Sequence, residues 1–400
     1  MVSTMVPNAH AASAGAIVMF DEVRSIAGTH DVTLATLASD GDDDALRVLR
    51  DMGVHVHATR RHRDDGIAGL VRRATVGMRW RLGDKPLRTT LFRERGLQRT
   101  LTRLKTTRFD VVHVLDNAMA CYDLPAAHAT VLTEYEVRTD TDDGWVNADD
   151  HVSPSVREAE RVRWWRYQSE VWSRFDRVQV FTDADAESVR RIAPHVADRV
   201  RVNPFGADVP GISEDVLERS DSVVFVGGFR HPPNVDAAVW LIDEILPLIR
   251  SRHSGVHVTI VGADPPERVR SRASESVTVT GRVDRVEPFV ASAAVVVAPV
   301  RSGGGMRLKV LQAMALGRPV VTTSRGAAGI WNPPGAPTLR VADDAAAIAG
   351  HVAALLESAA ERSALGTRAR EAVRTHHRRD AFAERLRAIY AELARSGAAA

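Results

Sequence analysis

Short apolar segments alternate with helical segments along this chain, and the series begins twice. The first series starts at Val2 and the second at Asp221, after a polar stretch at 213–220. Alternation of this kind favours parallel sheets with helices on both faces. The chain has 400 residues, which is too many for one ordinary core and enough for two domains. We therefore predict an α/β protein with two Rossmann-like domains, at 1–208 and 209–400, facing a central cleft.

Two of the predicted strands, at 109–116 and 129–136, are apolar runs of the kind found in buried parallel sheets. In the first domain the predicted strands lie at 2–6, 30–39, 54–57, 109–116, 129–136, 175–182 and 199–210. In the second domain they lie at 221–229, 257–266, 276–283, 293–300 and 318–324. Helical spacing is found at 16–27, 43–52, 157–173, 235–250, 289–294, 308–316, 344–357 and 379–394. The last helix is expected to pack back on the first domain.

Composition limits the class of protein. Cys121 is the one cysteine, which excludes an intrachain disulfide and a zinc cluster built on cysteine. No apolar run approaches the roughly 20 residues needed to cross a bilayer, and no basic segment precedes an apolar one at the start. Only three of the 53 basic residues are lysines, which is typical of a GC-rich bacterial genome. No nucleic-acid-binding motif is visible, so we predict a cytoplasmic protein without a nucleic-acid partner.

One segment is strongly basic. Between Arg60 and Lys105 there are fourteen arginines or lysines and four acidic residues, interleaved with apolar residues such as Met78, Trp80 and Leu82. Such a segment can lie on an anionic membrane surface or hold an acidic acceptor. The alternative is a helical face that is simply solvated. If the segment lies on a membrane, we expect a cytoplasmic protein in peripheral contact with the inner face of that membrane.

The stretch that indicates chemistry is APVRSGGGMRLKVLQAMALGRPVVTTSRGAAGI, at 298–330. A strand ends at Pro299, three glycines follow, and a helix is expected to begin near Met306. Glycines allow the backbone to approach a ligand closely, and a helix N-terminus offers unpaired N–H groups to an anion. Arg307 and Lys309 add positive charge in the same turn, and Gln312 can face the same cleft. The segment therefore suits a diphosphate; the alternative is a glycine-rich turn that only packs.

This segment resembles the donor-binding signature of family 4 glycosyltransferases, which have the GT-B fold. The resemblance extends over most of the chain. In the second half it includes FVGGFRHPPNVDAAVWLIDEILPLIR, TIVGADPP, TGRVDRVEPFVASAAVVVAPV and AMALGRPVV, and in the first half VLTEYE, RFDRVQVFTDADAESV and RVNPFGADVP. It implies a GT-B fold and transfer of a hexose or related sugar from a nucleotide-diphosphate sugar, with retention of anomeric configuration. No metal and no other cofactor is expected.

The resemblance also implies roles for individual residues. Arg282 and Val283 would hold the nucleotide base, while the main chain from Gly304 to Met306 would donate N–H groups to the diphosphate. Arg307 and Lys309 would stabilise the charge that builds on the leaving diphosphate. The donor-binding residues implied in this way are Gly227, Gly228, Arg230, Gly262, Arg282, Val283, Gly304, Gly305, Met306 and Gln312.

The sequence departs from the family pattern at several places. Gly304 and Gln312 stand where the family commonly has two glutamates. Gly304 has no side chain to offer a ligand, and Gln312 can form hydrogen bonds but has no negative charge. The basic residues of the family's phosphate loop are absent, and Arg230 or His231 can substitute for them. Tyr135 stands where many members place a histidine. These departures keep open a noncatalytic sugar-nucleotide-binding or scaffold descendant of the same fold, and an epimerase of related fold is a third alternative.

The first domain is expected to hold the acceptor, which the sequence leaves open as an envelope glycan, a glycolipid precursor or a small natural product. Glu134 and Glu136 flank Tyr135 at the end of a predicted strand, where positions 134 and 136 share one face. Either carboxylate can act as a base on an acceptor hydroxyl, and an ordinary salt-bridged role is the alternative. The catalytic candidates are Arg307, Lys309, Glu136 and Tyr135. The acceptor-binding candidates are His10, Asp116, Asn117 and Tyr122, with ordinary loop positions as the alternative.

Overall fold

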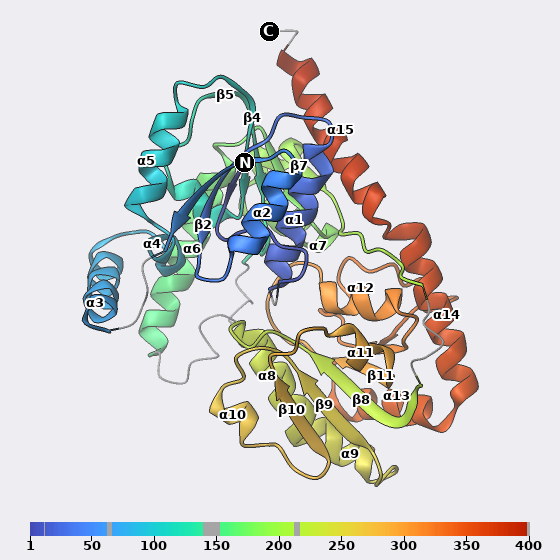
Figure 1. Ribbon diagram of the computed structural model, residues 1–400. Helices are drawn as coiled ribbons and strands as arrows, with labels where there is room; N and C mark the ends of the chain where they lie inside the picture. The colour runs from blue at the N-terminus through green and yellow to red at the C-terminus, as the bar shows by residue number, and fades with distance from the viewer. Residues whose placement is uncertain (12, 62–65, 139–152, 212–216, 398–400) are drawn as a thin grey trace. The chain divides into compact units, whose positions relative to one another are not determined.

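The computed structural model describes residues 1–11, 13–61, 66–138, 153–211 and 217–397. It separates into two compact units (Figure 1). Unit 1 contains the described residues up to 138, Ser153–Asn203 and the segment from Phe382 onward. Unit 2 contains the described residues of Pro204–Ala381. The final helix, α15 (Arg379–Gly397), therefore belongs to unit 1 over most of its length.

Unit 1 is built on a parallel sheet, which in the described part has seven strands in the order β3-β2-β1-β4-β5-β6-β7. Val2 lies beside Ala35 on one side and Val114 on the other, so the strand order reverses between β1 and β4. The strands are β1 (Val2–Ser3), β2 (Thr33–Ala38), β3 (His55–Arg60), β4 (Phe109–Leu115), β5 (Ala127–Thr133), β6 (Arg177–Val180) and β7 (Val200–Val202). In open α/β sheets ligands bind outside the carboxyl ends of the strands at such a reversal.

Helices cover both faces of this sheet. They are α1 (Ala14–Ala27), α2 (Asp43–Asp51), α3 (Gly66–Leu82), α4 (Leu87–Leu91), α5 (Arg95–Leu104), η1 (Asn117–Cys121), α6 (Pro154–Trp172), α7 (Asp183–Ile192) and η2 (Pro194–Arg199). Val131 packs in a cluster with Leu386 of α15, whereas Leu132 packs in a cluster with Trp172 of α6. Successive side chains of a strand point to opposite faces, so β5 is buried on both.

Unit 2 repeats the plan with a parallel sheet of six described strands in the order β10-β9-β8-β11-β12-β13. The strands are β8 (Arg219–Val226), β9 (His257–Val261), β10 (Val277–Gly281), β11 (Ala293–Ala298), β12 (Val320–Thr322) and β13 (Arg340–Val341). The helices are α8 (Pro232–Trp240), η3 (Leu241–Ile245), α9 (Leu246–Arg250), α10 (Glu267–Arg270), α11 (Glu287–Ala291), α12 (Leu308–Ala315), α13 (Ala345–Glu357) and α14 (Ala359–His376). Here the order reverses between β8 and β11.

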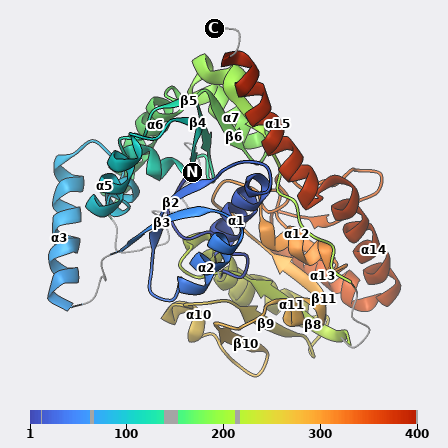
Figure 2. The ribbon, with the colours of Figure 1, turned by 45° about the horizontal axis from the view of Figure 1, so that its top comes forward.

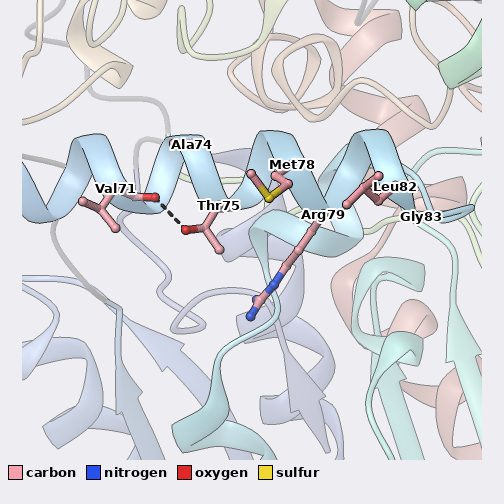
Figure 3. Close-up of a pocket in the computed structure, with 7 residues that line it drawn as sticks. All are labelled: Val71, Ala74, Thr75, Met78, Arg79, Leu82 and Gly83. Atoms are coloured by element: carbon pink, nitrogen blue, oxygen red, sulfur yellow. Dashed lines mark hydrogen bonds between the residues drawn. The ribbon is translucent and has the colours of Figure 1, made fainter.

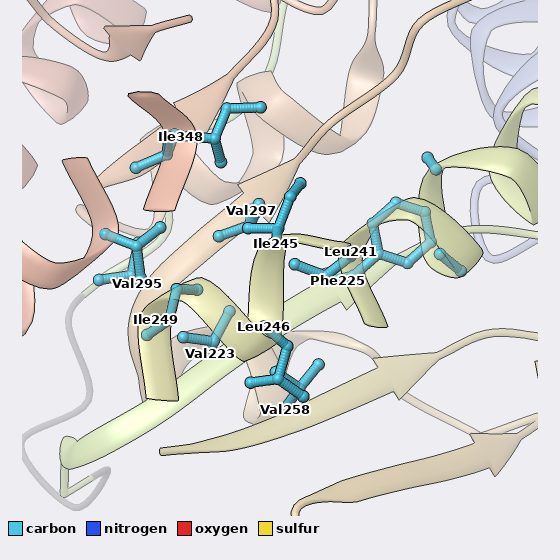
Figure 4. Packing of buried hydrophobic residues seen from close by; sticks show 14 of the residues in the cluster. Val223, Phe225, Leu241, Ile245, Leu246, Ile249, Val258, Val295, Val297 and Ile348 are labelled. Atoms are coloured by element: carbon cyan, nitrogen blue, oxygen red, sulfur yellow. The ribbon is translucent and has the colours of Figure 1, made fainter. Parts of the chain in front are cut away.

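The core of unit 2 lies between the sheet and the helical segment that follows β8. Leu241, Ile245 and Ile249 pack against Val223 and Val295 (Figure 4). This set is buried because the strands are apolar on both faces and the helical segment presents residues spaced by four.

The structure differs from the sequence predictions in several elements. The predicted helix 235–250 is interrupted by the π-helical turn η3, since Pro247 has no N–H to continue the regular pattern. The predicted helix 289–294 ends at Ala291, because Ala293 and Ala294 begin the fully buried strand β11. The helix expected near Met306 begins at Leu308.

The last helix, α15, contributes Leu386, Ile389 and Leu393 to the core of unit 1.

Candidate functional site

The carboxyl ends of β8 and β11 bring together the two glycine-rich segments of unit 2. Both strands are parallel neighbours, with Val223 beside Val295, so the loops that follow them leave the same edge of the sheet. The strand order reverses at this pair, which is where ligands bind in such sheets. The turn at 227–231 and the loop at 299–307, which are far apart in sequence, therefore share one site.

The turn after β8 is packed backbone against backbone. A Cβ atom on Gly262, at the end of β9, would lie 1.9 Å from the carbonyl oxygen of Gly227. A Cβ atom on Gly227 would lie 2.9 Å from the Cγ of Asn234. Neither position has room for a side chain, so both glycines are needed for the close approach of these segments.

Arg307 holds the loop between β11 and α12. Its guanidinium donates hydrogen bonds to the carbonyl oxygens of Ser302, Gly303 and Gly304, at 3.1, 2.5 and 2.6 Å. Gly303 and Gly305 have φ angles of 86° and 76°, in the region that favours glycine. Arg307 thus organises the loop from within, which is a different use of its charge from direct contact with a diphosphate.

Lys309 connects the two segments. Its Nζ donates to Oδ1 of Asn234 at 2.6 Å and lies 4.5 Å from the centre of the Phe225 ring. The amide of Asn234 in turn donates to the carbonyl oxygen of Gly228 at 2.8 Å. Burial, with a smaller effect from Arg307, lowers the pKa of Lys309 to about 7. The result is a lysine poised at neutral pH beside two glycine-rich turns.

Asn234 is a candidate that the sequence reasoning missed. It lies in the first turn of α8, five residues after the predicted strand and turn at 221–229, and carries no charge that would mark it. The available signal was its position directly after a Gly-Gly turn and two prolines. Its link to Lys309 spans 75 residues and could be found only in the folded chain.

The other predicted donor residues lie at the same edge of the sheet but apart from Lys309. Arg230 is 85% exposed and pairs with Asp264 at 2.7 Å. Arg282 is exposed and Val283 half-buried, and both follow β10, two strands from β8. Gln312 is exposed on α12, whereas Met306 is buried. The structure brings together the glycines, Arg307 and Lys309, and places the remaining candidates around them.

In unit 1, polar candidates follow β4 and β5. Asp116 has a φ angle of 92°, accepts a hydrogen bond from the Ala118 N–H at 2.9 Å and pairs with Arg88. The strained backbone of a buried, non-glycine residue is a feature that clusters at functional sites. Asn117 donates to Oε2 of Glu134 at 2.9 Å, and so links the two strand ends.

Glu134 is a buried acid. Its Oε2 also accepts from Nε1 of Trp172 at 2.9 Å, and burial raises its pKa to about 8. β5 ends at Thr133, so Glu134 to Glu136 follow the strand and do not share a strand face as predicted. Each side chain instead has its own partner. Glu136 lies 3.7 Å from Arg138, whose guanidinium is 4.3 Å from the centre of the Trp164 ring.

Tyr135 is held by a second buried acid, Glu22 of α1. The Tyr135 hydroxyl donates to Glu22, which also accepts from the Thr133 hydroxyl at 2.7 Å and the Gln179 amide at 2.8 Å. Burial raises the pKa of Glu22 to about 7 and that of Tyr135 well above its ordinary value. Tyr135 is therefore a protonated donor here. Glu22 was also missed from the sequence, where its signal is an acid next to Asp21 in a helix whose first seven residues are apolar or small.

The remaining acceptor candidates have structural partners or lie at the surface. The Tyr122 hydroxyl accepts from the Glu94 N–H at 2.6 Å and donates to the Phe92 carbonyl oxygen, and its side chain is buried. His10 is exposed, and its N–H donates to Asn8 in the loop between β1 and α1. Their roles toward an acceptor stay predictions.

The described residues lack a metal cluster and a helix that could span a membrane. Among them no group of three or more histidine, cysteine, aspartate or glutamate side chains is arranged to hold a metal ion. In the same part of the chain no helix combines the length and the apolar character that crossing a bilayer requires.

Several solved structures are similar to this chain over nearly its whole length. Sucrose-phosphate synthase from Thermosynechococcus elongatus matches with a TM-score of 0.64 and 15% identity, over 99% of this chain and 98% of that one. HepE from Anabaena, in complex with UDP and glucose, matches with a TM-score of 0.59 and 11% identity, over 99% and 98%. A glycosyltransferase from Rickettsia africae matches with a TM-score of 0.61 and 12% identity, over 98% of both chains.

The chain has the GT-B fold. Within this GT-B chain, residues 220–358 match the family model described as Glycosyl transferases group 1. The matched segment contains Asn234, Lys309 and the glycine-rich turns of unit 2. No curated protein matches the sequence. The fold and the family match together support a glycosyltransferase, and the predicted fold class is confirmed.

Proposed function

We propose that this chain is a retaining, family 4 glycosyltransferase that moves a hexose or related sugar from a nucleotide-diphosphate sugar to an acceptor. The observation that carries the proposal is the Lys309–Asn234–Gly228 link across the carboxyl ends of β8 and β11. It sets a half-buried lysine beside the turn after β8, where Gly227 has no room for a side chain, within the segment that matches the transferase family. HepE, a structure of the same fold, holds UDP and glucose, which is consistent with such a donor.

In the proposed reaction unit 2 holds the donor diphosphate. Main-chain N–H groups at 304–306 and the start of α12 face the phosphates, and Lys309 gains full charge as the diphosphate approaches. The acceptor hydroxyl forms the new bond to the anomeric carbon on the side that the diphosphate leaves. The bond to the phosphate oxygen breaks, and that oxygen takes the hydroxyl proton. The proposed reaction needs no metal and no other cofactor.

Acceptor binding is assigned to unit 1, around Asp116, Asn117 and Glu134–Glu136. Two buried acids with raised pKa values, Glu22 and Glu134, lie among these residues and can keep a proton at neutral pH. An envelope glycan or glycolipid precursor is the acceptor that suits a cytoplasmic enzyme at the inner face of a membrane. A small natural product is the alternative.

A second function is favoured by specific observations. Gly304 offers no side chain to a donor sugar, Gln312 supplies no negative charge, and Tyr135 is bound to Glu22. These features suit a noncatalytic descendant that binds sugar nucleotides or acts as a scaffold.

Thermal-shift measurements with UDP, GDP, ADP, dTDP and CDP distinguish the two functions. A selective rise in melting temperature with one nucleotide supports the donor site and selects the sugars for turnover assays. Binding with no transfer to any acceptor favours the noncatalytic function. The absence of a shift, confirmed by calorimetry, contradicts the donor site itself.

A further inference from the structure

Helix α3 (Gly66–Leu82) presents an apolar face to solvent. Leu70, Val71, Met78 and Leu82 are 60%, 60%, 63% and 83% exposed. With Ala74 they recur every three or four residues, so they share one face of the helix. They border a shallow hollow of about 540 Å³, which is lined by Val71, Ala74, Thr75, Met78, Arg79, Leu82 and Gly83 (Figure 3).

The opposite face of α3 attaches the helix to unit 1. Val76 is buried, and Nε1 of Trp80 donates to Glu160 of α6 at 2.7 Å. The guanidinium of Arg163 lies 4.5 Å from the centre of the Trp80 ring. At 3.6 residues per turn, Val76 and Trp80 lie nearly opposite Val71 and Met78. The contacts with α6 therefore turn the apolar face outward, and both ribbon views show α3 at the outer margin of unit 1 (Figures 1 and 2).

The charge of α3 has one sign. Its 17 residues include four arginines and no acidic residue, and Arg79 borders the exposed hollow. In the segment that follows, up to Lys105, several basic side chains are held by partners within unit 1, such as Lys85 by Glu170 and Lys105 by Asp123. An exposed apolar face on a cationic helix is the pattern of a helix that lies in a membrane interface.

We propose that α3 docks unit 1 on an anionic membrane surface. Val71, Met78 and Leu82 enter the boundary between headgroups and acyl chains, and Arg79 lies among the lipid phosphates. A second copy of the chain is a poorer occupant, because a symmetric interface would bring two helices with four arginines each against one another. This proposal does not depend on sugar transfer.

Sedimentation of the full chain with lipid vesicles tests it. Vesicles of phosphatidylcholine with phosphatidylglycerol are compared with phosphatidylcholine alone, and we expect at least roughly tenfold stronger binding to the anionic vesicles, weakened by salt. The double variant Met78→Gln, Leu82→Gln should lose roughly tenfold or more of this binding with an unchanged melting temperature, since both side chains are exposed. Val48→Gln, Leu248→Gln is the matched control, because these residues are also exposed and apolar but lie on α2 and α9.

The proposal is overturned if the wild-type chain binds neither vesicle, or if Met78→Gln, Leu82→Gln binds as well as the control. Self-association that this variant abolishes, with no vesicle binding, would show that a second copy covers the face. A site-specific label gives an independent measurement, because Cys121 is the one cysteine and burial raises its pKa to about 11. A fluorophore on Leu82→Cys should move to an apolar environment with anionic vesicles, and one on Val48→Cys should not.

Discussion

Lys309 and Asn234 form a hydrogen bond of 2.6 Å between Nζ and Oδ1, and this bond joins the helix after β11 to the helix after β8. Through Asn234, which donates to the carbonyl oxygen of Gly228, the pair links Lys309 to the Gly227–Gly228 turn where the strand order reverses. A cation at this place can respond to a phosphate without moving far.

Lys309→Ala should weaken nucleoside diphosphate binding by roughly 10- to 100-fold, since a hydrogen bond to a charged group is worth about 1.5–3 kcal/mol. Isothermal titration with the nucleotide identified by thermal shift measures this change. Lys85→Ala is the matched control, because Lys85 pairs with Glu170 at the surface of unit 1. Equal affinities of the two variants would remove Lys309 from the donor site.

The variant Arg307→Lys tests whether Arg307 acts by holding its loop or by direct action of its charge on the ligand. A lysine keeps the charge but cannot donate to three carbonyl oxygens in the geometry of a guanidinium. Because Arg307 holds the loop, we expect the variant to bind nucleotide about as weakly as Arg307→Ala and to melt at a lower temperature than wild type. Wild-type affinity in Arg307→Lys would instead indicate that the charge itself acts on the ligand.

Nucleotide binding should be linked to proton uptake. The pKa of Lys309 is lowered to about 7 by burial, and a nearby diphosphate favours the charged form and raises that pKa. Above pH 7 the free protein has lost the proton and the complex has regained it, so affinity should fall as the pH rises from 7 to 9. Titrations in buffers with different ionisation enthalpies measure the uptake, which should disappear in Lys309→Gln. Uptake that persists in this variant comes from another group.

Two buried acids of unit 1 should each contribute less to its stability as the pH rises. Glu22 and Glu134 have pKa values of about 7 and about 8 in the folded chain, above the ordinary value of 4.5. Each acid therefore binds its proton more tightly in the folded state, and its contribution to the free energy of unfolding falls as the pH rises from about 4.5 through its folded pKa, whereas buried His113, whose pKa is lowered to about 3, contributes in the opposite direction. Urea unfolding at pH 5 to 8.5 measures the slope, and Glu134→Gln should shift it toward higher stability at high pH relative to wild type. A slope unchanged in Glu134→Gln and in Glu22→Gln would exclude both acids as its source.

Gly262→Ala should destabilise unit 2, because the new Cβ atom would lie 1.9 Å from the carbonyl oxygen of Gly227. Overpacking of this kind costs about 1–3 kcal/mol and should also disturb nucleotide binding. Gly335→Ala is the control, since a Cβ atom there meets nothing within 4 Å. Thermal unfolding compares the melting temperatures of the two variants. If they are equal, the close approach of Gly262 to the carbonyl oxygen of Gly227 is not required for the stability of unit 2.

Patterns of neighbouring residues in the sequence were enough to predict most helices and strands and the part of the candidate site at 303–309. The apolar runs at 109–116 and 293–300 are strands because continuous apolar segments suit parallel sheets buried on both faces. The glycines at 303–305 and the charges of Arg307 and Lys309 lie within seven residues, so their chemistry is visible without a fold. The order of several such motifs indicated the GT-B fold.

The tertiary structure decided what each of these groups contacts. Asn234 meets Lys309 across 75 residues, Glu22 meets Tyr135 across 113, and Glu160 meets Trp80 across 80. Long-range pairs of this kind depend on strand order and helix rotation, which periodicity alone does not specify. The sequence thus determined the alternating architecture and the glycine-rich turns. Folding decided that Arg307 holds its own loop, that the pKa of half-buried Lys309 is lowered to about 7, and that the apolar face of α3 is turned to solvent.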